Sequence, residues 1–169
     1  MEKKPEDWLI ELVESLDGVE SVLDVGTGHS GVFAYHYWQS KPLKRKACLD
    51  IALIREDIDP SWGRWYADAR SLPLPDDSFD VVQCTETLEH IPPRDHRRVL
   101  RELKRVAKKL VYLTASGKGQ HRGPEQRELE RRNPYARFIA FPDVGLLREE
   151  GFKILLHLPE RHVKAYWKP

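Results

Sequence analysis

The chain has 169 residues, a net charge of +1, and 33% charged residues. This length suits one domain with a full core, so we expect a single domain over residues 1–169. A nearly neutral chain has no overall field that would draw it to nucleic acid or to a membrane. The sequence shows no apolar run of membrane-spanning length and no signal peptide at its charged amino terminus, so we expect a cytoplasmic enzyme.

The composition also bears on stability. Charged residues exceed the roughly 25% of typical domains, and the chain holds one Asn (Asn133) and one Met (Met1). Because hyperthermophilic proteins favour charged residues over thermolabile ones, we expect a thermophilic source.

The first elements in chain order alternate between helix and strand. Pro5 in a first turn and apolar residues at helical spacing predict a helix over Pro5–Leu16. A short apolar run then predicts a strand over Ser21–Val25, followed by a helix over Gly31–Ser40. Further strands are expected over Lys46–Ile51, Arg64–Asp68 and Phe79–Cys84. The prolines within residues 71–78 exclude a helix before the last of these strands.

The second half continues the alternation. Apolar residues on one face predict a basic helix over Pro93–Lys109, and a strand follows over Leu110–Ala115. After a charged stretch over residues 117–141, we expect a helix over Pro142–Glu150 and two strands that pair antiparallel, Lys153–Leu158 and His162–Trp167. Strands alternating with helices indicate a doubly wound, mostly parallel α/β sheet, which binds ligands beyond the carboxyl ends of its strands.

A glycine-rich turn follows the first strand. Gly26 and Gly28 allow close backbone approach and positive φ angles. The spacing of Gly26, Gly28 and Gly31, with Asp50 22 residues after Gly28, also fits the dinucleotide fingerprint, so a nicotinamide or flavin enzyme stays open. The carboxylate of Asp24 favours the opposite interpretation, because it would repel a pyrophosphate and hold an ammonium group.

The run Val-Leu-Asp-Val-Gly-Thr-Gly over residues 22–28 resembles the first motif of class I S-adenosylmethionine-dependent methyltransferases. The similarity to the short stand-alone branch of this family extends from about Ser21 to Lys109, through Leu-Pro-Leu-Pro-Asp-Asp-Ser-Phe-Asp and Leu-Glu-His-Ile. It implies a Rossmann-like sheet of seven strands with the last strand antiparallel, and S-adenosylmethionine as the cofactor. In that strand order the first strand separates Cys48 from Cys84, so we expect free thiols.

The resemblance also implies roles for single residues. Asp24 would lie near the cofactor's ammonium, with the backbone of Gly26, Thr27 and Gly28 at its methionyl part. Asp50 would accept from both ribose hydroxyls, Ile51 would lie against the adenine, Asp68 would accept from the adenine amino group, and the Ala69 N–H would reach a ring nitrogen. The expected cofactor site is completed by residues at neighbouring strand ends: Val25, Cys84 and Thr85. Taken singly, Asp50 could equally cap a helix and Asp68 could be a turn residue.

Methyl transfer from a sulfonium is an in-line displacement that needs alignment, and a base only for a weak nucleophile. Glu86, after the fourth strand, is the candidate catalytic residue, although a solvated acid or salt-bridge partner is the alternative. His90 and His121 are weaker candidates. The other histidines show no metal-ligand spacing in the sequence, so no metal is expected.

The methyl acceptor is not readable, and a small molecule is slightly favoured over RNA or protein. The basic helix over residues 94–108 is either a solvated face or an RNA contact, and the arginines of residues 117–141 form either a lid with an anion site or a charged surface. Short connections after Ile51 and Asp68 leave one sheet face thinly covered, so we expect a partner subunit, as in a homodimer, or residues 117–141 to cover it. A NAD-dependent oxidoreductase and a non-catalytic S-adenosylmethionine-binding module remain as alternatives.

Overall fold

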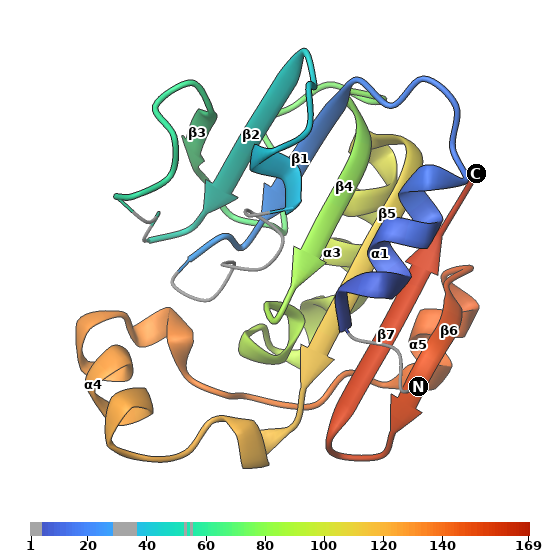
Figure 1. Cartoon of the computed structure of the whole chain (residues 1–169). Helices are drawn as coiled ribbons and strands as arrows, with labels where there is room; N and C mark the ends of the chain where they lie inside the picture. The colour runs from blue at the N-terminus through green and yellow to red at the C-terminus, as the bar shows by residue number, and fades with distance from the viewer. Residues whose placement is uncertain (1–4, 29–36, 53, 55) are drawn as a thin grey trace.

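The computed structural model describes residues 5–28, 37–52, 54 and 56–169 (Figure 1). The strands are β1 (Ser21–Val25), β2 (Arg45–Asp50), β3 (Gly63–Tyr66), β4 (Phe79–Thr85), β5 (Ala107–Ser116), β6 (Lys153–Leu158) and β7 (His162–Trp167). The α-helices are α1 (Pro5–Glu14), α3 (Pro93–Val106), α4 (Pro124–Arg132) and α5 (Val144–Glu149), with short 3-10 turns η1 (Leu88–His90), η2 (Lys118–Gln120) and η3 (Pro134–Ala136). Most of the helix expected over Gly31–Ser40 lies outside the described residues.

One seven-stranded sheet runs through the protein in the order β3-β2-β1-β4-β5-β7-β6. Neighbours pair in parallel across β3-β2-β1-β4-β5, whereas β7 pairs antiparallel with both β5 and β6. This confirms the predicted doubly wound sheet and its antiparallel last strand. Because β1 lies between β2 and β4, Cys48 and Cys84 are separated, and both are free and buried as expected.

Two apolar layers cover the sheet, with α1 on one face and α3 and α5 on the other (Figure 1). Successive residues of β1 alternate between them: Val22 packs with Leu9 of α1, whereas Leu23 packs in the cluster that contains Leu103 of α3. The loop between β2 and β3 covers part of the α1 face itself, because Ile54, Ile58 and Trp62 are 1–4% exposed.

The covering expected from residues 117–141 is therefore wrong for this face. The stretch holds η2, α4 and η3, and α4 lies beyond the carboxyl ends of the parallel strands (Figure 1).

The boundary between α3 and β5 differs from the prediction by three residues. The sequence favours helix up to Lys109, but Ala107 has extended backbone angles and pairs with Phe79 as the first residue of β5. Burial does not distinguish the two elements here, because Val106 and Ala107 are buried and would suit a strand as well as a helix; the pairing with β4 sets the boundary. None of the helices in the described ranges is long and apolar enough to cross a bilayer.

Candidate active site

A cavity of about 590 Å³ opens at the carboxyl ends of the parallel strands. The strand tips contribute Gly26, Gly28, Asp50, Ile51, Asp68 and Ala69 to its wall. The segments after β4 and β5 contribute Glu86, Thr87, His90 and His121, and the far wall comes from α4 and η3. The cavity therefore lies where the alternating fold places ligands, and nine of the candidate residues named from the sequence line it.

The turn after β1 requires its glycines. Gly26 has a φ of +77° and Gly28 a φ of +39°. A side chain at Gly26 would overlap Thr87, and a Cβ at Gly28 would lie 3.2 Å from Asp50 Oδ2. The amides of Gly26 and Thr27 donate to the Leu49 carbonyl at 2.7 and 3.2 Å, which fixes the turn against β2. Because Gly26 and Gly28 have no side chains, the Asp50 carboxylate can line the cavity.

Asp24 lies under this turn rather than in the cavity wall. Its register partners are Cys48 on β2 and Gln83 on β4. The side chain is 1% exposed, and neither carboxylate oxygen has a hydrogen-bond partner among the described residues. Burial raises the pKa of Asp24 to about 6, and the neighbouring Gln83 amide and Thr27 hydroxyl offset this only in part. A buried carboxylate without a partner is costly, so a cation above the turn would relieve it.

The acids at the next two strand tips are already oriented. Asp50 accepts from the Ala52 amide at 2.9 Å. Asp68 holds the guanidinium of Arg70, with Nε at 3.0 Å and Nη2 at 2.7 Å from its oxygens, and Arg70 also reaches Asp95 at 3.1 Å. This guanidinium holds the pKa of Asp68 below its ordinary value. Both oxygens of Asp68 already accept two hydrogen bonds, because the backbone amide and Nε of Arg70 also donate to Oδ1 at 2.9 and 3.0 Å, so a ligand at Asp68 would share or displace these contacts.

Five of the proposed cofactor residues do not line the cavity: Asp24, Val25, Thr27, Cys84 and Thr85. Val25 and Cys84 are fully buried in the core. These residues support the glycine turn and the end of β4 from behind, so their expected direct contact with a cofactor stays a prediction.

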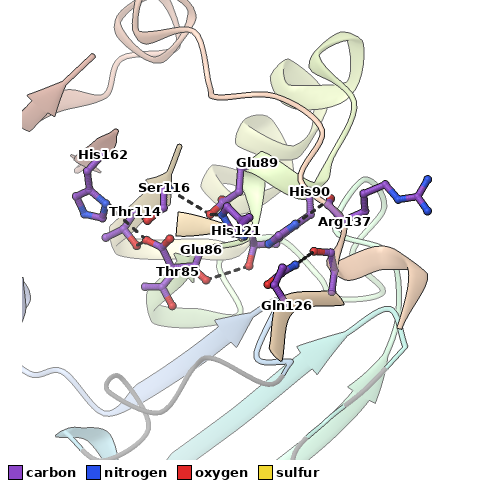
Figure 2. Close-up of polar contacts among 12 residues, drawn as sticks. Thr85, Glu86, Glu89, His90, Thr114, Ser116, His121, Gln126, Arg137 and His162 are labelled. Atoms are coloured by element: carbon purple, nitrogen blue, oxygen red, sulfur yellow. Dashed lines mark hydrogen bonds and ion pairs between the residues drawn. The ribbon is translucent and has the colours of Figure 1, made fainter. Parts of the chain in front are cut away.

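Glu86 is held in a strained position at the end of β4. Its φ of +52° is unusual for a residue with a side chain, and such strain is frequent at functional sites. Its Oε1 accepts from the Thr114 hydroxyl at 2.9 Å and lies 4.0 Å from His162 Nδ1 (Figure 2). The Glu86 amide donates to the Thr114 carbonyl at 2.9 Å. The carboxylate is thus oriented by β5 at the wall of the cavity.

Three further side chains meet beside Glu86 in a way that the sequence did not predict. Glu89 is fully buried, and its Oε1 accepts from the Ser116 amide at 3.1 Å and lies 3.5 Å from His121 Nε2. His90 adds a ring at 4.9 Å from that of His121, and its Nδ1 lies 3.0 Å from the Arg137 carbonyl (Figure 2). Burial raises the pKa of Glu89, and the contact with Glu89 raises that of His121. Because 30 residues separate His90 from His121 in the sequence, no spacing rule predicts that they meet.

The segment after β5 closes the far side of the cavity. Gln126 of α4 donates to the Ala136 carbonyl at 3.0 Å, which joins α4 to η3. Its wall residues are uncharged apart from His121: they include Gln126, Leu129 and Tyr135. None of the arginines of residues 117–141 is among the residues that line this cavity, so the lid with an anion site stays a prediction beside its alternative, a charged surface helix.

Comparisons with known proteins agree with this geometry. A family model described as a methyltransferase domain matches residues 23–114, more than half of the chain. The chain is 48% identical over 52 residues to 27-O-demethylrifamycin SV methyltransferase of Amycolatopsis mediterranei. That segment is 31% of this chain and only 18% of the curated relative.

Solved structures share the fold. A SAM-dependent methyltransferase from Aquifex aeolicus aligns with a TM-score of 0.61 and 21% identity, over 96% of this chain and 89% of its own. A structure from Haloferax volcanii, of the Trm112 methyltransferase activator in complex with a methyltransferase, gives a TM-score of 0.61 and 16% identity, over 96% and 91% of the two chains. Together with the matched family model, the glycine turn and the strand-tip acids show that the chain belongs to the methyltransferase domain family, the class I S-adenosylmethionine-dependent methyltransferases.

Proposed function

We propose that the protein transfers a methyl group from S-adenosylmethionine to an acceptor bound in the same cavity. The observation that carries this proposal is that one cavity joins the strand-tip acids to Glu86. The cofactor supplies a methyl group on a positively charged sulfur, so the residues of the chain need only bind and align the two reactants.

The strand tips suit each part of that cofactor. Asp50 presents a carboxylate that can accept from two ribose hydroxyls, and Ile51, 38% exposed on the cavity wall, offers an apolar surface to the adenine. Asp68 and the backbone of Ala69 remain the proposed partners of the adenine edge. The buried charge of Asp24, directly or through water, stabilises the ammonium group above the glycine turn.

Glu86 is the proposed catalytic residue on the acceptor side. The Thr114 hydroxyl donates to its carboxylate, and Glu86 lies in the wall of the cavity that also contains the strand-tip acids. There it can accept a hydrogen bond from the acceptor or remove its proton as the new bond to carbon forms.

A small-molecule acceptor is supported over RNA or protein. A partly enclosed cavity of about 590 Å³ falls within the usual range for small ligands. The basic helix α3, expected as the alternative RNA contact, has much of its charge paired within the protein. Arg97, Arg101 and Lys104 surround Glu150, and Arg105 binds Glu102 and Asp76. A side-chain cation that already forms a salt bridge within the protein binds an RNA phosphate less strongly.

Two alternatives are separated by experiment. A NAD-dependent oxidoreductase would place a pyrophosphate over a turn with a buried carboxylate beneath it, which is unfavourable. A non-catalytic module would bind S-adenosylmethionine without turnover.

Titration calorimetry with NAD and with S-adenosylmethionine tests the oxidoreductase. Incubation with S-adenosylmethionine carrying a labelled methyl group, offered with fractionated cellular small molecules, RNA and protein, tests the acceptor class and the non-catalytic module. We expect labelled product in the small-molecule fraction and its loss in Glu86→Gln. Label in the RNA or protein fraction would contradict the proposed acceptor class, and no label in any fraction despite cofactor binding would favour the non-catalytic module.

We also propose a thermophilic origin, supported by the charged networks around Arg70, Arg105 and Glu150. A single domain, a cytoplasmic location and a homodimer stay predictions from the sequence.

A further inference from the structure

We propose that Glu89, His90 and His121 bind a divalent transition-metal ion, most favourably Zn²⁺, at the acceptor side of the cavity. Glu89 and His90 belong to η1, and His121 follows η2. Their ligand atoms all lie within 4.8 Å of one another, in the group of three that the described part of the chain offers. Two imidazoles and one carboxylate are a donor set that zinc uses in catalytic sites with a fourth, open position.

The contact of His90 with the Arg137 carbonyl leaves the Nε2 atom of this histidine available to bind a metal ion. The Arg137 carbonyl, 3.0 Å from His90 Nδ1, can only accept, so Nδ1 carries the hydrogen and Nε2 keeps its lone pair. A backbone carbonyl on the far nitrogen is the usual outer partner of a metal-binding histidine, because it fixes the ring and its tautomer.

The other two residues present buried atoms without hydrogen bonds. Glu89 is 0% exposed; its Oε1 accepts from the Ser116 amide, while its Oε2 has no hydrogen-bond partner in the described residues. His121 Nε2 also lacks a hydrogen bond, although it faces Glu89 Oε1 at 3.5 Å. Unsatisfied buried polar atoms are rare in native proteins and call for an explanation such as an ion. A metal ion at this point satisfies both atoms at once.

The geometry needs only a small contraction. Metal–ligand distances of about 2.0–2.2 Å in a tetrahedral site place ligand atoms about 3.3–3.6 Å apart. Glu89 Oε1, the other oxygen of the same carboxylate, already lies this far from His121 Nε2, and the 4.8 Å limit on the separations in the group exceeds it by about 1.2–1.5 Å. η1 is itself anchored, since the Glu89 carbonyl accepts from the amides of Ile139 and Ala140 at 2.8 and 3.2 Å.

The open position would face the acceptor. His90 and His121 both line the cavity, and Glu86 lies in the same wall. An oxygen of the acceptor bound at the fourth position would be held in place and made more acidic. This role rests on the proposed methyl transfer, whereas binding of the metal does not.

The test is titration of untagged, chelator-treated full-length protein with Zn²⁺ alone, by calorimetry and by competition with a chromophoric chelator. We expect one ion per chain, and a loss of affinity of about 100-fold or more in His90→Ala and in His121→Ala, since even outer partners account for 10- to 100-fold. His157→Ala is the matched control, because this histidine is exposed on β6 and should leave zinc binding unchanged.

A second measurement, the thermal unfolding midpoint, distinguishes loss of the metal site from unfolding of a variant. Zn²⁺ should raise the thermal unfolding midpoint of the wild-type protein but not that of Glu89→Gln, a substitution of the same shape. The proposal would be overturned if wild-type protein bound Zn²⁺ no more tightly than the three site variants do. If zinc binds as expected but S-adenosylmethionine does not, the metal site stands and the proposed function fails.

Discussion

The buried carboxylate of Asp24 makes a prediction that links stability to binding. Burial raises its pKa from the ordinary 3.8 to about 6, so the folded protein without ligand holds this charge at a cost above pH 6. The difference between the two pKa values corresponds to about 3 kcal/mol. Asp24→Asn removes the charge, so the variant should be up to about 3 kcal/mol more stable than wild type at pH 8.

The sign of the pH dependence is fixed by the raised pKa. Below pH 3.8 the group is protonated in both folded and unfolded protein, so the gain should vanish; it should grow between pH 3.8 and about 6 and stay constant at higher pH. The assay is urea unfolding of wild type and Asp24→Asn across pH 4–8. Calorimetry at pH 8 should show weaker binding of S-adenosylmethionine by the variant, by about 10- to 100-fold, if the charge stabilises the ammonium.

Asp80 is the control, because this aspartate is also buried, although less deeply than Asp24, and its carboxylate has hydrogen-bond partners. Burial acts to raise its pKa, but hydrogen bonds from the Glu20 amide at 2.9 Å and the Ser21 hydroxyl at 3.0 Å, with Lys109 nearby, hold the pKa of Asp80 below its ordinary value. Asp80→Asn should therefore destabilise the protein at neutral pH, with a smaller effect in acid. A gain for Asp24→Asn that does not change with pH, or a loss at pH 8, would refute the reasoning.

Four further predictions concern cofactor binding, catalysis and stability. Asp50→Ala should weaken binding of S-adenosylmethionine by about 1.5–3 kcal/mol because the ribose loses a charged acceptor; unchanged affinity by calorimetry would reject its assignment. Glu86→Gln should lower kcat about 100-fold with the cofactor Kd unchanged, and equal kcat values would remove Glu86 from the chemistry. Burial acts to raise the pKa of Glu150, but salt bridges from Arg97, Arg101 and Lys104 outweigh it and lower this pKa to about 2. Glu150→Gln should therefore lower the free energy of unfolding by about 2 kcal/mol at pH 7, and this loss of stability should shrink as pH falls from 4.5 toward 2. Differential scanning calorimetry should place the wild-type Tm above about 65 °C, and a Tm in the mesophilic range would argue against a thermophilic source.

Most of the strands and helices of the sheet can be predicted from the sequence because local residue patterns determine them. The apolar run of β1 and the two glycines after it identify the strand and its turn, and acids at three strand tips identify the ligand edge. The boundary between α3 and β5 was placed wrongly because residues 106–111 fit either element by pattern alone, and only their pairing with β4 decides.

The acceptor side depends on contacts that no local pattern contains. His90 and His121 meet through tertiary structure, and the chain between them has to fold through β5 before η2 brings His121 back. Similarly, the wall made by α4 depends on its contact with η3, since the charged sequence of α4 is equally typical of an exposed helix.

A crystal structure of the protein with S-adenosylhomocysteine tests most directly whether the strand-tip acids bind a phosphate-free nucleoside. We expect both ribose hydroxyls on the carboxylate of Asp50, the adenine against Ile51 with its amino group near Asp68, and the ammonium group above the turn that covers Asp24. Density for the nucleoside away from Asp50 and Asp68, or a NAD molecule bound over the glycine turn in a parallel soak, would contradict it.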